Sequence, residues 1–142
     1  MKALNRNTLV ALFILGWSLS FNVLANEKAE SKAASSASAW LNLVDAGKYG
    51  ESWETAAAYF KNSVGKQQWE QMLAAVRKPL GQLVSRELKS KNHMESLPGA
   101  PDGKYVVIQF TSVFENKKSA IETVTPMLDP DGKWKVSGYY IQ

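Results

Sequence analysis

The sequence predicts an α+β domain in which about three N-terminal helices pack on one face of a four-stranded antiparallel meander sheet. Apolar residues recur every three or four positions as far as Arg77 and at every second position after Gly81. These are the periods of amphipathic helices and of half-buried strands. Short turns separate the strand-like stretches, and this favours antiparallel pairing because a parallel pair needs a long crossover. Helices followed by such strands form a two-layer α+β architecture.

The first 25 residues (1–25) are predicted to be a secretory signal peptide. Lys2 and Arg6 give a positive start, an apolar run over 8–21 follows, and Ala25 supplies the small residue before the cleavage site. The run is shorter than the roughly 20 residues that a helix needs to cross a bilayer. We therefore expect a periplasmic protein that begins near Asn26 and has no membrane anchor in its mature form.

Composition limits what the mature chain can be. Removing 25 of 142 residues leaves 117, which suits a single domain over 39–142 preceded by 26–38. The absence of cysteine excludes disulfides, thiol chemistry and a cysteine-linked lipid anchor. Without Lys2 and Arg6, 15 basic residues face 13 acidic ones, a net charge of +2. A balance so close to neutral gives no support to nucleic-acid binding.

The first predicted helix follows a stretch with little to bury. Residues 26–38 are mostly Ala, Ser, Lys and Glu, which fits either a flexible leader or the exposed start of the first helix. Its apolar stripe then has helical spacing and consists of Ala37, Trp40, Leu41 and Val44. Gly47 is the expected end of this helix.

Two further helices are predicted before the sheet. One spans 52–62, with Ser52 as its N-cap. The other spans 66–77, and Pro79 and Gly81 end it because they disfavour a continuing helix.

Four strands are predicted from period-2 alternation and from β-branched and aromatic content. They cover residues 83–88, 104–115, 120–128 and 133–142. Turn-forming residues separate them at 98–103, 116–118 and 129–132.

Four segments, 40–53, 76–90, 97–117 and 122–141, together resemble an exported bacterial family known as domain of unknown function 4019. They read WLNLVDAGKYGESW, VRKPLGQLVSRELKS, LPGAPDGKYVVIQFTSVFENK and ETVTPMLDPDGKWKVSGYYI. The resemblance covers essentially the whole mature chain and implies no established activity. The order of helices before a curved sheet is also similar to the nuclear-transport-factor-2-like, or cystatin-like, α+β rolls. Such rolls include enzymes, ligand binders and interaction modules, so the fold does not decide the function.

Several kinds of chemistry lack the residues they need. His93 is the only histidine, is expected in an exposed polar loop, and has no cysteine partner for zinc or for a nucleophilic pair. Residues 129–132 and 102–103 contain Asp-Gly pairs, but they lack the ligand spacing of an EF-hand and are better explained as turns. The glycines are scattered singly and form no phosphate-binding loop. We expect no metal site and no cofactor.

Two charged residues share faces with apolar ones. Period 2 places Arg86 on the same face as Val84 and Leu88, and it places Glu122 with the inward-facing apolar residues of 120–128. A buried charge without a partner is costly. The simplest hypothesis pairs Arg86 with Glu122 across the concave face of the sheet, with Arg77 as the alternative donor. These residues form either a structural ion pair or the lining of a ligand pocket.

Aromatic residues are predicted to fill much of the core. Trp40, Trp53, Trp69, Trp134 and Tyr140 lie on apolar faces of their elements. Tyr139 alternates to the opposite face from Tyr140, so it is expected to be exposed and available to a partner.

The sequence favours a non-enzymatic periplasmic binding module for a small polar ligand or an envelope peptide, with Arg77, Arg86 and Glu122 as its candidate site. A structural or interaction subunit that acts through its sheet edge, or as a homodimer, is the alternative. A third possibility is a weak hydrolase or isomerase that uses Glu122 or Asp45 as general base in a roll-type cavity.

Overall fold

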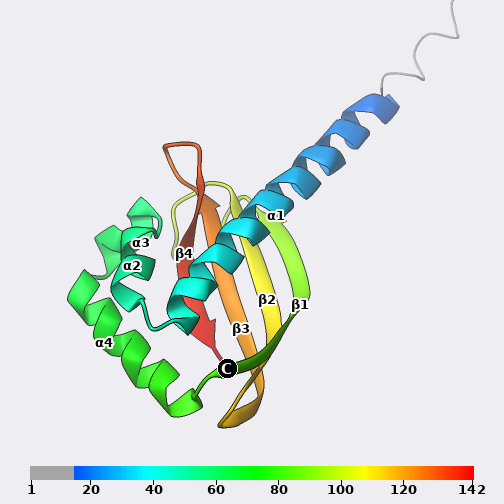
Figure 1. Ribbon diagram of the computed structural model, residues 1–142. Helices are drawn as coiled ribbons and strands as arrows, with labels where there is room; N and C mark the ends of the chain where they lie inside the picture. Colours follow the sequence, from blue (N-terminus) through cyan, green and yellow to red (C-terminus); the bar gives the residue numbers. More distant parts are fainter. Residues whose placement is uncertain (1–14) are drawn as a thin grey trace, which may run out of the picture.

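The computed structural model describes residues 15–142 (Figure 1). The helices are α1 (Leu15–Asp45), α2 (Tyr49–Glu54), α3 (Ala58–Ser63) and α4 (Lys66–Arg77), followed by the 3-10 turn η1 (Lys78–Leu80). The strands are β1 (Leu83–Met94), β2 (Tyr105–Phe114), β3 (Lys117–Leu128) and β4 (Trp134–Ile141). The charged start and most of the apolar run of the predicted signal peptide lie outside the described residues.

The four strands form one antiparallel sheet in the order β1-β2-β3-β4, and the predicted α+β class is confirmed. The helices gather on one face of the sheet (Figure 1). α1 crosses that face and contacts all four strands, and α4 lies beside the β4 edge (Figure 1). β1 and β4 are therefore the two edge strands.

The main core lies between α1 and the inner face of the sheet. One stripe of α1 is buried there: Ala33, Ala37, Trp40, Leu41 and Val44. Alternate residues of β2 face it, namely Val106, Ile108 and Phe110. Burial of this stripe is what holds α1 on the sheet, because hydrophobic burial is the dominant favourable term in folding.

α1 begins earlier than its apolar stripe predicts. The helix includes 26–38 and runs through the bond between Ala25 and Asn26, where cleavage is expected. Residues 21–28 are exposed, and this part of α1 projects from the domain (Figure 1). Within residues 15–142, no helix combines the length and the apolar character needed to cross a membrane.

The helix predicted over 52–62 is wrong in one respect, because the structure divides it into α2 and α3. Ala57 lies between them in an extended conformation, and its N–H donates to the carbonyl of Val136 on the β4 edge at 2.8 Å. This long-range bond interrupts a segment of good helical periodicity. Ser52 is not an N-cap; it is buried within α2, where its hydroxyl accepts a hydrogen bond from Trp69 Nε1 at 3.0 Å.

β1 does not bury the apolar residues predicted for its inner face. The pairing with β2 shifts between Leu83 and Ser85 and again after Leu88. Val84 is 64% exposed and Leu88 is 52% exposed. Arg86 is opposite the buried Ser112 and therefore does face inward.

A second irregularity reverses the predicted faces of β4. Pro126 pairs with Val136 and Thr125 with Gly138, so β4 carries one extra residue at this point. Beyond this bulge, Tyr139 lies on the inner face, whereas Tyr140 is 51% exposed. The prediction that Tyr140 packs inward and Tyr139 outward is wrong because one inserted residue exchanges the two faces.

Gly81 determines the backbone conformation with which the chain enters β1. Its φ of 72° and ψ of −161° lie in a region that is essentially restricted to glycine. A Cβ atom at this position would also lie 2.6 Å from the Glu115 carboxylate, which accepts the N–H of Gln82. The chain therefore needs glycine here to turn from η1 into β1.

Candidate functional site

Six polar side chains meet on the inner face of the sheet, at the C-terminal ends of α1 and α4. Each of these two helices and each of the four strands contributes one of them. We call this set the charge network; it consists of Asp45, Arg77, Arg86, Ser112, Glu122 and Tyr139.

Arg86 is the centre of the charge network. Its Nε lies 2.7 Å from Glu122 Oε1 and its Nη2 lies 3.1 Å from Glu122 Oε2. On the other side, Nη1 and Nη2 donate to the Asp45 carboxylate at 2.7 and 3.0 Å. Burial lowers the pKa of Arg86, but its hydrogen bonds to Asp45 and Glu122 outweigh this effect and raise the pKa above its usual range. Two bidentate pairs of this kind are strong and geometrically specific.

Glu122 is completely buried. Besides Arg86, it accepts hydrogen bonds from the Ser112 hydroxyl and the Tyr139 hydroxyl, both at 2.5 Å. Burial, and then the charge of Glu122, raise the pKa of Tyr139 well above its usual value. The Tyr139 hydroxyl therefore keeps its proton at neutral pH and donates a hydrogen bond to the Glu122 carboxylate.

Arg77 links α4 to the charge network. Its Nη2 donates to Asp45 at 2.7 Å, its Nη1 lies 3.4 Å from the Tyr139 hydroxyl, and its guanidinium lies 4.8 Å from the centre of the Phe114 ring. Burial lowers the pKa of Arg77, whereas the hydrogen bond to Asp45 raises it, and the net change is upward. Its Nε is buried without a hydrogen-bond partner among the described residues.

The formal charges within the charge network balance. Two guanidinium groups face two carboxylates, so the formal charges cancel. Burial raises the pKa of Asp45, but its hydrogen bonds to Arg86 and Arg77 together lower it below the ordinary value of 3.8. A general base at neutral pH is favoured by a pKa near 7. Asp45 is therefore poorly suited to the role of base that its sequence position left open.

Sequence reasoning identified half of the charge network. Arg77, Arg86 and Glu122 were singled out, and the structure brings all three together around Asp45 and Tyr139. Asp45 was considered only as a base, and Ser112 and Tyr139 were not placed here. The alternation of β2 carries a signal for Ser112, because it shares the face of the buried even-numbered residues.

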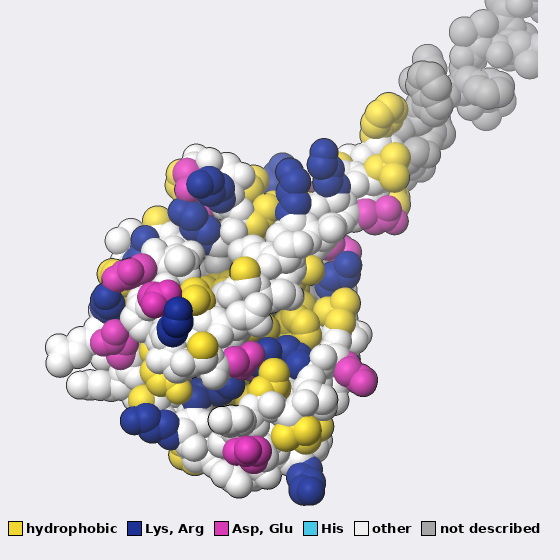
Figure 2. All heavy atoms as spheres, in the orientation of Figure 1, with side chains coloured by type: hydrophobic (Ala, Val, Ile, Leu, Met, Phe, Trp, Pro, Cys, Tyr) yellow, Lys and Arg dark blue, Asp and Glu magenta, His cyan; other side chains and the backbone are white. Residues whose placement is uncertain are grey.

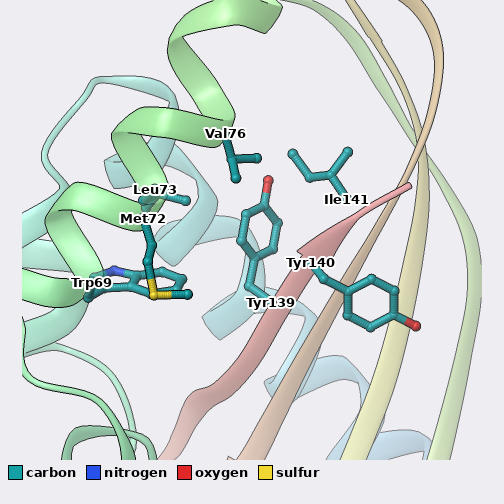
Figure 3. Close-up of a pocket in the computed structure, with 7 residues that line it drawn as sticks. All are labelled: Trp69, Met72, Leu73, Val76, Tyr139, Tyr140 and Ile141. Carbon is teal, nitrogen blue, oxygen red and sulfur yellow. The ribbon is translucent and has the colours of Figure 1, made fainter.

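An apolar groove lies next to the charge network, between α4 and the end of β4 (Figure 3). We call it the α4–β4 groove; it has a volume of about 230 Å³ and is lined by Trp69, Met72, Leu73, Val76, Tyr139, Tyr140 and Ile141. Figure 3 shows the α4 side chains on one side and the β4 side chains on the other, with Tyr139 between them. Met72 and Val76 are each about half exposed, at 51% and 48%.

The backbone of β4 is open beside this groove. Ile121 and Gln142 exchange two hydrogen bonds of 3.0 Å, which makes them a hydrogen-bonded pair of the antiparallel ladder. Such pairs alternate along a ladder, so the N–H and C=O groups of Tyr139 and Ile141 point away from β3. Nearer the start of β4, the Ala57 N–H donates a hydrogen bond to the Val136 carbonyl and covers the edge there. Among the residues that the structure describes, nothing pairs with the Tyr139 and Ile141 part of the β4 edge.

Two other hollows occur on the described surface. One of about 310 Å³ lies between α1 and α2 and is lined by Ser36, Ala39, Trp40, Leu43, Thr55 and Val136. The other, of about 380 Å³, lies where α1 leaves the domain. Across residues 15–142, no three His, Asp or Glu side chains are grouped as a metal site would require.

Comparison with known families decides the membership of this chain. The model of the family described as "Protein of unknown function (DUF4019)" matches residues 36–139, which is more than half of the sequence. The chain belongs to this family. All six residues of the charge network lie within the matched part of this DUF4019 domain. No curated protein and no solved structure matches the chain.

The lowered pKa of Asp45 predicts how the stability of the DUF4019 domain depends on pH. A depressed carboxyl pKa contributes stability above the unfolded-state pKa, and this contribution disappears as the pH falls through the folded-state pKa. We expect wild type to be more stable than Asp45→Asn at pH 7, and the difference to shrink as the pH falls below about 3.8. Urea unfolding of both proteins over a pH series measures it. A stability difference between wild type and Asp45→Asn that does not change with pH would contradict a lowered pKa for Asp45.

Proposed function

We propose that this DUF4019 domain is a non-enzymatic binding module of the bacterial envelope that takes an extended peptide segment of a partner protein in the α4–β4 groove. One observation carries the proposal: backbone N–H and C=O groups of Tyr139 and Ile141 that have no partner within residues 15–142 lie beside an apolar groove. A peptide strand can add to an open sheet edge through main-chain hydrogen bonds, while pockets for alternate side chains select its sequence.

The lining of the groove indicates the kind of peptide. The α4 wall consists of Trp69, Met72, Leu73 and Val76, and none of these side chains carries a charge. Successive side chains of a strand point to opposite faces. A bound segment would therefore place apolar side chains at alternate positions against α4. The volume of about 230 Å³ is below the roughly 300–1,000 Å³ of small-molecule sites and suits individual side chains better.

The charge network argues against a small polar ligand. A ligand that used Arg86 or Glu122 would have to displace bonds that these residues already make to Asp45, Ser112 and Tyr139. A buried ion left without its partner is strongly destabilising. We therefore assign the charge network a supporting role: it holds Tyr139, and hence the floor of the groove, in place.

Export to the envelope belongs to the same proposal. Its support is the order of positive, apolar and small residues over 1–25, which is typical of a signal peptide. An envelope protein would meet partners with exposed or extended segments outside the cytoplasm. The proposal joins the two leading sequence-based alternatives, since the binding site is itself a sheet edge.

Selection from a phage-displayed library of random peptides tests the proposal. We expect selected peptides to carry apolar residues at alternate positions and to bind Val76→Asp at least about tenfold more weakly, because the new carboxylate would be desolvated in the groove. Val84→Asp is the matched control, since Val84 is also an exposed valine, at 64% against 48% for Val76, but lies on β1. Selected peptides that bind the Val76 variant normally would contradict the proposal. A dimer that blocks the groove would also contradict it, because the occupant would then be a second copy.

A further inference from the structure

Lysines gather where α1 leaves the domain. The hollow of about 380 Å³ at this end is lined by Ala25, Lys28, Ala29, Lys32, Lys104, Leu128, Gly132 and Trp134. Lys133, between the last two of these residues, is exposed on the β3–β4 hairpin. Figure 2 shows the corresponding concentration of basic side chains around the base of α1 and the hairpin. We call Lys28, Lys32, Lys104 and Lys133 the lysine collar.

Nearby acidic residues offset the charge of the lysine collar only in part. Lys28 and Lys32 are four positions apart and so project from one face of α1. Glu30 is two positions from each of them and projects from the opposite side. On the hairpin, Lys135 lies 2.8 Å from Asp131 and 3.3 Å from Asp129, so one lysine faces two carboxylates and Asp131 also offsets part of the charge of Lys133.

In the uncleaved chain, apolar residues of the predicted signal peptide continue beyond the lysine collar along α1. Phe21, Val23 and Leu24 are exposed by 68%, 56% and 62%. Figure 2 shows hydrophobic side chains along this projecting part of the helix, past the lysines. Trp134, which is partly buried in the floor of the hollow, is of a residue type enriched at membrane–water interfaces. Only the uncleaved chain would present all three kinds of residue to a bilayer, because Phe21, Val23 and Leu24 belong to the predicted signal peptide; the lysines and Trp134 remain after cleavage.

From this arrangement we infer that the lysine collar docks this end of the protein on an anionic phospholipid surface. The lysine ammonium groups would meet the headgroup phosphates, an attraction that falls off within a Debye length. Cleavage after Ala25 would retain all four lysines and add the positive α-amino group of Asn26 beside Lys28. The inference does not depend on peptide binding. The α4–β4 groove lies toward the opposite end of the domain (Figure 1), so docking would leave it accessible.

Vesicle co-sedimentation tests the inference. The full 142-residue chain is expressed in a bacterial host, the N-terminus of the recovered protein is established by its intact mass, and binding is compared between vesicles of phosphatidylcholine alone and vesicles containing phosphatidylglycerol. We expect binding only to the anionic vesicles. The triple variant K28Q/K32Q/K104Q should reduce the partition coefficient by at least about tenfold.

Two matched variants make the result specific. K78Q/K89Q/K118Q removes three exposed lysines elsewhere on the domain and should bind as wild type does. K28R/K32R/K104R keeps the charge and should also bind, which separates loss of charge from loss of folding. Equal binding to neutral vesicles, with the N-terminal segment present or removed, would overturn the inference. An equal loss in both glutamine variants would overturn it as well.

Discussion

Replacing Glu122 by glutamine is expected to lower the free energy of unfolding by about 3–5 kcal/mol, the usual effect of breaking a buried ion pair. The substitution keeps the volume of the side chain and removes its charge. Arg86 would then be buried opposite an uncharged amide, with only Asp45 to balance it. The amide NH₂ group would also have to replace one of the oxygens that now accept bonds from Ser112 and Tyr139.

Urea denaturation at pH 7 measures this effect. Glu87→Gln is the matched control, because Glu87 is exposed on β1 close to Arg86. Its stability should stay within about 0.5 kcal/mol of wild type, as is usual for surface substitutions. If Glu122→Gln costs no more than this control, Glu122 does not hold the buried charge network together. The double variant Arg86→Gln/Glu122→Gln adds a check, since residues in direct contact should not show additive effects.

Replacing Ile141 by proline is expected to weaken peptide binding strongly, whereas Ile141→Val should bind as wild type does. Proline removes the N–H that points away from β3, and it leaves the β3–β4 ladder intact because proline is tolerated on the open side of an edge strand. Valine keeps this N–H and a similar side-chain size. A lost hydrogen bond with a desolvated peptide carbonyl costs about 1–3 kcal/mol, which is roughly a fivefold to 150-fold loss of affinity.

Titration calorimetry with a peptide selected on wild type measures this effect, after circular dichroism has verified that both variants fold. Equal affinity for the proline and valine variants would show that the peptide does not pair with the β4 backbone. Binding would then depend on side-chain contacts alone, and the groove would be an apolar patch rather than a strand-addition site.

Predictions from the sequence were correct for elements in which the local pattern of residues agreed with the tertiary contacts. α4 has the predicted bounds because its stripe, containing Trp69 and Leu73, is buried and Pro79 and Gly81 follow it. Arg86 and Glu122 were predicted as neighbours because period 2 placed both on the inner face, and they lie 2.7 Å apart.

The predictions that failed have physical causes that the spacing of apolar residues does not reveal. The bulge in β4 exchanged the faces of Tyr139 and Tyr140, so the groove and the place of Tyr139 in the charge network could not be predicted from alternation alone. The bond from Ala57 to Val136 joins residues far apart in the chain and divides a helix that is continuous by propensity. The early start of α1 reflects its Ala, Lys and Glu content, since these residues favour helix without needing burial.

Amide hydrogen exchange at Tyr139 and Ile141, with and without a selected peptide, tests the central claim most directly. Without peptide, these two amides should exchange rapidly, whereas those of Tyr140 and Gln142 should be protected by their bonds to β3. Saturating peptide should slow exchange at Tyr139 and Ile141 specifically. If the peptide binds and these two amides exchange as fast as before, the β4 edge is not the binding site.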